Sequence, residues 1–127
     1  MKKYSLVILI AIVFLVIGGF VVVSKNHQPA NENTADPPSI NQYFWSETCP
    51  HCAKVAEFLD GWDKKDKFQL EKFEINESSE NRLKFYKMGM FCEISRDNLG
   101  VPFLVTSEGK CFIGDEPIIG YLESLDI

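Results

Sequence analysis

The first hydrophobic feature of the chain is a run over residues 4–23, which contains no charged side chain and only one tyrosine and one serine among apolar residues and glycine. At about 1.5 Å per residue, a helix of this length spans about 30 Å, the thickness of the hydrocarbon core of a bilayer. Lys2 and Lys3 precede the run, which favours a cytoplasmic N-terminus and an exported remainder. The pattern predicts an N-terminal transmembrane signal-anchor over residues 1–24.

A cleaved secretory signal is the main alternative to an anchor. Its apolar core is usually about 7 to 15 residues long, and Val22-Val23-Ser24 is a poor cleavage sequence. The length therefore favours the anchor, and both interpretations place the rest of the chain outside the cytoplasm. Residues 25–39 are polar and rich in proline and asparagine, which predicts a flexible tether.

From residue 40 onward, the apolar spacing alternates between that of strands and that of helices. Predicted strands cover residues 40–45, 68–75, 101–105 and 111–113. The first predicted helix begins at Cys49-Pro50 and ends near Gly61. The second is capped by Asn76 or Ser79 and ends near Met90, and the last is capped by Asp115 or Glu116. This order predicts an α/β domain over residues 40–127 with a four-stranded mixed sheet and helices on both faces.

Helical spacing also predicts which side chains face the core. The expected inward residues of the three helices, in chain order, are Val55, Phe58, Leu59 and Trp62; Leu83, Tyr86 and Met90; and Ile118, Ile119, Leu122 and Leu125.

The net charge of the chain is −5, but the charges are unevenly distributed. Residues 39–127 contain 16 of the 18 acidic side chains. Such an acidic domain repels phosphate backbones, which argues against nucleic-acid binding.

The chemistry of the chain centres on Cys49-Pro50-His51-Cys52, which opens a predicted helix directly after a predicted strand. Unpaired N–H groups and the helix dipole stabilise a negative charge there, and the thiolate is the nucleophile of disulfide exchange. Cys52, one turn later, can attack a mixed disulfide and release the partner. His51 can stabilise the Cys49 thiolate further by a hydrogen bond or a positive charge.

Two structural alternatives remain at this motif: an inert disulfide, and part of a zinc site, for which four cysteines and two histidines offer ligands. Zinc is disfavoured because Cys92 and Cys111 stand singly, without a second paired motif. A disulfide within C-x-x-C closes too short a loop to add much stability. Redox chemistry without a metal or organic cofactor is the favoured interpretation.

Residues 44–52 resemble the active-site segment of the thioredoxin superfamily, and the CPHC form is similar to that of bacterial periplasmic disulfide oxidases. Gly100-Val101-Pro102-Phe103 resembles the cis-proline strand of the same superfamily. The resemblance covers nearly all of residues 40–127. It implies a thioredoxin-like fold in which Pro102 is cis and packs against Cys49 and Cys52, while Val101 shapes a substrate groove through its backbone.

The chain also departs from these relatives. Only 49 residues separate Cys52 from Pro102, so the domain is minimal and glutaredoxin-sized. It nevertheless lacks the glycine pair of glutaredoxins, which argues against glutathione binding. The first strand has no clear counterpart of the buried acid that thioredoxins use for proton transfer. Glu47 and Glu74 are interpreted as surface or edge charges.

Cys92 and Cys111 are predicted to form a structural disulfide, because the cysteine count is even and the compartment is oxidising. With 18 residues between them, the bond is expected to stabilise the fold by about 3 kcal/mol. A second redox pair that relays electrons to Cys49 and Cys52 is the alternative.

The resulting hypothesis is a membrane-tethered, extracytoplasmic thiol–disulfide oxidoreductase. Cys49 is the nucleophile, Cys52 resolves the mixed disulfide, His51 tunes the thiolate, and Pro50, Val101 and Pro102 position the substrate. The expected partners are cysteine-containing exported proteins and a membrane redox partner, and the direction of electron flow is open. A non-enzymatic tethered module that binds a metal or a partner, with both cysteine pairs structural, is the second hypothesis.

Overall fold

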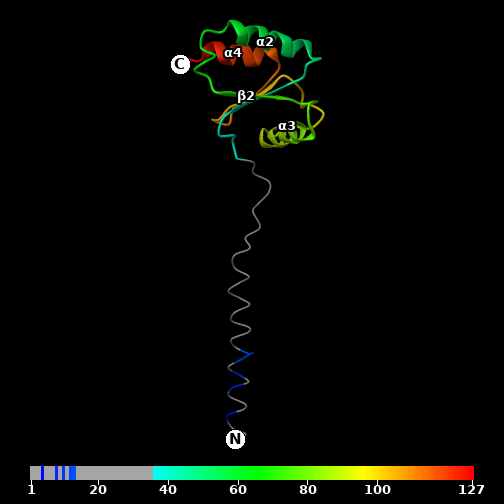
Figure 1. The fold of residues 1–127 in the computed structure, drawn as a ribbon, viewed down its shortest axis with the longest axis vertical. Coiled ribbons are helices and arrows are strands. Elements are labelled where there is room, and N and C mark those ends of the chain that lie inside the picture. Colours follow the sequence, from blue (N-terminus) through cyan, green and yellow to red (C-terminus); the bar gives the residue numbers. More distant parts are fainter. Residues whose placement is uncertain (1–3, 5–7, 9, 11, 14–35) are drawn as a thin grey trace. The chain divides into compact units, whose positions relative to one another are not determined.

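The structure is a computed structural model that describes residues 4, 8, 10, 12, 13 and 36–127. Residues 36–127 belong to one compact unit (Figure 1). The predicted anchor and tether lie outside the described residues, apart from isolated positions of the apolar run and residues 36–39. No helix among the described residues is long and apolar enough to cross a bilayer.

The folded unit is an α/β domain, as the sequence predicts. In chain order its elements are β1 (Asn41–Trp45), α2 (Pro50–Gly61), β2 (Leu70–Glu74), α3 (Ser79–Phe91), β3 (Phe103–Val105), β4 (Cys111–Ile113) and α4 (Asp115–Ser124). The four strands form one mixed sheet in the order β2-β1-β3-β4. β1 is parallel to β2 and antiparallel to β3, and β3 is antiparallel to β4.

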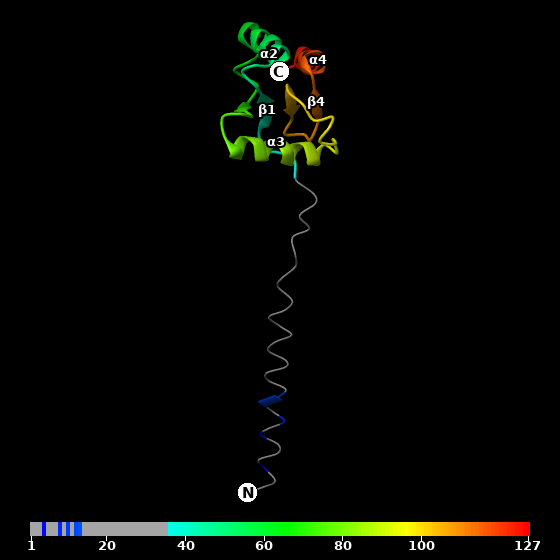
Figure 2. The ribbon, with the colours of Figure 1, turned by 90° about the vertical axis from the view of Figure 1, so that its right-hand side faces the viewer.

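Alternation along the central strand β1 divides the hydrophobic core into two layers. Tyr43 points to the face covered by α2 and α4, where it joins Val55, Leu59 and Ile118. Phe44, the next residue, points to the opposite face and packs with residues of α3. Helices therefore cover both faces of the sheet, with α2 and α4 on one side and α3 on the other (Figure 2).

The predicted inner stripe of α3 is wrong. Leu83 and Met90 are each 69% exposed and Tyr86 is 37% exposed, whereas Phe85 and Met88 are buried. The helix carries apolar residues on two opposite sides, and the aromatic core selects between them. The ring of Phe85 lies 5.7 Å from that of Phe44 and 6.0 Å from that of Phe103, between centroids.

Two predicted helix caps are also corrected by the structure. The N-cap of α3 is Ser78, whose hydroxyl accepts a hydrogen bond from the amide of Asn81 at 3.1 Å. The N-cap of α4 is Gly114, whose φ of 95° lies in the left-handed region that glycine adopts without a Cβ clash. Asp115 is consequently the first residue of the helix, and its side chain is free to bind elsewhere.

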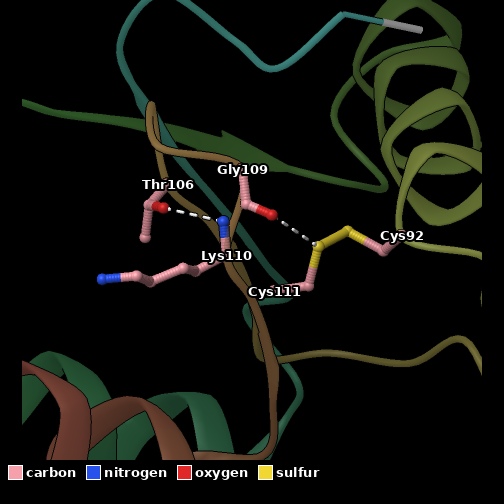
Figure 3. Close-up of a disulfide and its surroundings, with 5 residues drawn as sticks. All are labelled: Cys92, Thr106, Gly109, Lys110 and Cys111. Carbon is pink, nitrogen blue, oxygen red and sulfur yellow. Dashed lines mark hydrogen bonds between the residues drawn. A yellow bond between two sulfur atoms is a disulfide. The ribbon is translucent and has the colours of Figure 1, made fainter. Parts of the chain in front are cut away.

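Cys92 and Cys111 form a disulfide, with their Cα atoms 6.1 Å apart (Figure 3). Cys92 follows the last turn of α3 and Cys111 begins β4, so the bond holds the end of α3 against the sheet. The turn that leads into β4 is closed by the Lys110 amide, which donates to the Thr106 hydroxyl at 3.0 Å. The disulfide predicted from the sequence is confirmed as a pairing.

Candidate active site

Cys49 stands where β1 ends and α2 begins. It is the N-cap of α2, and Pro50 occupies the first turn, where its missing N–H is no loss. The amide of Cys52 donates a hydrogen bond to the Cys49 Sγ at 3.2 Å. Because this N–H is one of those that a helix leaves unpaired at its start, it stabilises negative charge on the Cys49 sulfur.

The loop before β3 brings a second segment to this sulfur. The Val101–Pro102 peptide bond is cis, as the resemblance implies. The Val101 carbonyl oxygen lies 3.6 Å from the Cys49 Sγ and accepts from the thiol. The Pro102 carbonyl in turn accepts from the Gly114 amide at 2.9 Å. The cis-proline segment is thus connected both to the Cys49 sulfur and to the start of α4.

Cys52 differs sharply from Cys49 in its surroundings. Both residues are thiols in this structure, but Cys52 is buried while Cys49 is partly exposed. Burial raises the pKa of the Cys52 thiol to about 12. Cys49 is therefore the more accessible of the two sulfurs, and Cys52 is shielded from solvent.

Tyr43 is the site residue that sequence analysis missed. Its side chain is 3% exposed, and its hydroxyl has no hydrogen-bond partner among the described residues. The hydroxyl lies close to the Cys52 thiol, where it opposes the effect of burial on the pKa of that thiol. Burial raises the pKa of Tyr43 itself well above its ordinary value, so the phenol keeps its proton and can donate to a Cys52 thiolate.

His51 is oriented by a carboxylate from another helix. Its Nδ1 lies 2.9 Å from Oδ1 of Asp115, and Lys54 Nζ lies 3.0 Å from Oδ2 of the same side chain. The hydrogen bond from Lys54 lowers the pKa of Asp115 to about 2, and the bond from His51 acts in the same direction. An ionised carboxylate only accepts, so the His51 Nδ1 is the donor. Asp115, predicted as a helix cap, instead positions the imidazole.

A shallow cleft of about 570 Å³ adjoins the start of α2. Its lining residues are Trp45, Ser46, Glu47, Thr48, Glu74, Asn76 and Glu77. Glu47 is exposed, and Glu74 accepts hydrogen bonds from the amides of Glu47 and Asn76. These contacts support the interpretation of both acids as edge charges rather than as a buried proton acceptor.

The structure brings six of the predicted site residues to one end of the sheet: Cys49, Pro50, His51, Cys52, Val101 and Pro102. Cys111 pairs with Val105 at the far end of β3 from Pro102, so the Cys92–Cys111 bond lies outside this group. No cluster of three or more potential metal ligands occurs among the described residues.

The sequence matches no known protein-family model and no curated protein. Function is therefore inferred from the geometry of the site.

Replacing Tyr43 by phenylalanine removes the hydroxyl next to Cys52 and leaves the ring in place. A hydrogen bond to a charged group contributes about 1.5–3 kcal/mol, so we expect attack by Cys52 on a mixed disulfide at Cys49 to slow by about ten- to a hundredfold. Stopped-flow measurement of leaving-thiol release from a preformed mixed disulfide tests this.

The free energy of unfolding should not fall in this variant, because a buried hydroxyl without a partner in the resting structure costs stability rather than adding it. Tyr121→Phe, which alters a half-buried tyrosine stacked on Phe112, is the control. An unchanged release rate in Tyr43→Phe would exclude the proposed role of the hydroxyl.

Replacing Asp115 by asparagine removes the charge that binds His51 and Lys54. In the folded protein the pKa of Asp115 falls from 3.8 to about 2, so its ionic contacts stabilise the fold above about pH 4 and are lost as the pH falls toward 2. We expect Asp115→Asn to be less stable than the wild type at pH 6 and nearly equal to it at pH 2.

Denaturant unfolding at both pH values measures the difference, with Glu123→Gln at the exposed end of α4 as the control. If the difference in free energy of unfolding between Asp115→Asn and the wild type were as large at pH 2 as at pH 6, the stabilising role of the ionised Asp115 would be contradicted.

Proposed function

We propose that the protein is a membrane-tethered thiol–disulfide oxidoreductase of the thioredoxin superfamily, with Cys49 as its nucleophile. The observation that carries this proposal is the hydrogen bond from the Cys52 amide to the Cys49 Sγ at the first turn of α2. It places an accessible sulfur where backbone N–H groups favour the thiolate, and the thiolate is the reactive form in disulfide exchange.

The two cysteines perform the exchange in two steps. The Cys49 thiolate attacks one sulfur of a substrate disulfide, a mixed disulfide forms, and the other substrate sulfur leaves as a thiolate. Cys52 then loses its proton and attacks the Cys49 sulfur, which forms the Cys49–Cys52 disulfide and releases the remaining substrate sulfur. The substrate gains two electrons and the protein loses two, and the reverse sequence oxidises a dithiol substrate.

Cys52 and Tyr43, the buried residues of the site, control the rate of the second step. Because burial raises the pKa of Cys52 to about 12, its thiolate is scarce until a partner donates to it. The Tyr43 hydroxyl is placed to be that donor. His51, in the first turn of α2, is held by Asp115 from the other helix on this face.

Substrate positioning is assigned to the segment around the cis peptide bond. The Val101 carbonyl already accepts from the Cys49 thiol, so a substrate chain that displaces this contact meets exposed backbone beside the nucleophile. The proposed substrates are exported proteins with cysteine residues, and a membrane redox partner would recycle the pair. The apolar run over residues 4–23 supports this location.

Single cysteine variants test the mechanism. Cys49→Ala should abolish disulfide exchange, because Cys52 is buried and cannot reach an external disulfide. Cys52→Ala should keep the first step and accumulate mixed disulfides with substrate proteins, detectable as reductant-sensitive adducts on non-reducing gels. The assay is reduction of a disulfide-bonded protein substrate by the prereduced full chain.

The double variant Cys92→Ala/Cys111→Ala is the matched control. It removes the other cysteine pair, so retained exchange distinguishes a structural disulfide from an electron relay. Exchange by Cys49→Ala at the wild-type rate would rule out the proposed function and favour a binding module with inert cysteines.

A further inference from the structure

The outer face of α3 carries an unpartnered apolar stripe made of Leu83, Tyr86 and Met90. At about 100° per residue these side chains lie along one side of the helix, opposite Phe85 and Met88. Within residues 36–127 the only other exposed large hydrophobic residue is the terminal Ile127. The outer faces of α2 and α4 thus have no such stripe in the described part of the chain.

Basic side chains surround this stripe. Arg82 and Lys87 are exposed, one on each flank of the stripe. The Arg96 guanidinium lies 5.3 Å from the centre of the Tyr86 ring. The single acid of α3, Glu80, is paired with Lys84 at 3.1 Å. Within α3 three basic side chains stand against one acidic one, so the helix itself is cationic. Glu93 and Asp97, beyond its end, are exposed acids, and residues 39–127 as a whole carry 16 acidic side chains against 10 basic ones.

The chain also enters the folded unit on the side of α3. A Cβ placed on Gly109 would lie 3.4 Å from Cζ of Phe91, the last residue of α3, and 3.8 Å from Cβ of Pro37. Pro37 is thus a neighbour of the end of α3, and Figure 2 shows the first described residues of the unit, in cyan, beside this helix. The tether predicted from the sequence over residues 25–39 would reach about 20 Å on average, which would bring a bilayer that holds the predicted anchor within range of this face.

We infer that the outer face of α3 docks on an anionic lipid bilayer. Leu83, Tyr86 and Met90 enter the boundary between headgroups and acyl chains, and Arg82, Lys87 and Arg96 meet the lipid phosphates. Amphipathic helices with this division of residues lie in the plane of membrane interfaces. The inference takes only the membrane tether from the proposed function and is independent of the thiol chemistry.

A second copy of the chain fits this face less well than lipid. Two α3 faces brought together would oppose their basic residues, and like charges across an interface disfavour association. Three apolar side chains also fall short of the roughly 800 Å² per partner that stable protein interfaces bury.

Docking through α3 has a consequence for the proposed active site. Cys49 begins α2, which covers the other face of the sheet. A domain resting on α3 therefore leaves the start of α2 and the exposed part of Cys49 open to proteins in the aqueous phase.

Oxidation of Met90 by hydrogen peroxide reports docking without a label. The full chain is mixed with vesicles of phosphatidylglycerol or of phosphatidylcholine at a low protein-to-lipid ratio, and methionine sulfoxide is measured by peptide mass spectrometry. Each basic residue close to an anionic surface strengthens binding about fivefold. We therefore expect Met90 to oxidise at least about fivefold more slowly on phosphatidylglycerol. Met88, buried in the core, is the internal reference.

Charge reversal identifies the face responsible. Arg82→Glu/Lys87→Glu should restore the oxidation rate seen on phosphatidylcholine, whereas Lys65→Glu/Lys72→Glu makes the same change of net charge at exposed positions outside α3 and should keep the protection.

If the chain binds both kinds of vesicle and Met90 oxidises at the same rate on both, the proposed docking of α3 is wrong, while the membrane tether remains supported. Protection that rises with protein density rather than lipid charge would also overturn it, in favour of self-association. A full chain that binds neither vesicle would remove the tether and the docking surface together.

Discussion

The interaction on which the proposed activity depends is the hydrogen bond between the Cys52 amide and the Cys49 sulfur. It exists because β1 ends just before a helix whose first N–H groups have no carbonyl partners. A sulfur at that position is stabilised as an anion by backbone alone. The Val101 carbonyl also contacts this sulfur, and His51, in the first turn of the same helix, is held by Asp115.

The two faces of the sheet support different parts of the molecule. On one face, Tyr43 of β1 belongs to the core beneath α2, and its hydroxyl lies close to the Cys52 thiol. On the other face, Phe44, Phe85 and Phe103 hold α3, and the Cys92–Cys111 bond fixes its end. Because these contacts hold the inner side of α3 on the sheet, its outer side is free to contact another surface. The proposed surface is an anionic lipid bilayer.

The elements and the site motif follow from local patterns, but three features do not. Helical spacing is satisfied in α3 both by Leu83, Tyr86 and Met90 and by Phe85 and Met88, and only the aromatic cluster of the sheet decides between them. Tyr43 lies in a β-favouring run, and the sequence does not distinguish it from an ordinary core residue. Only the structure shows that its hydroxyl is buried without a hydrogen-bond partner in the described part of the chain. Asp115 resembles a helix cap because its contact with His51 joins residues 64 positions apart. The anchor over residues 4–23 stays a prediction.

The most direct test of the central claim is the rate at which iodoacetamide alkylates Cys49 in the prereduced full chain near neutral pH. Because backbone N–H groups at the first turn of α2 favour the thiolate, which is the reactive form, we predict a rate well above that of free cysteine under the same conditions. A rate no higher than that of free cysteine would contradict the account.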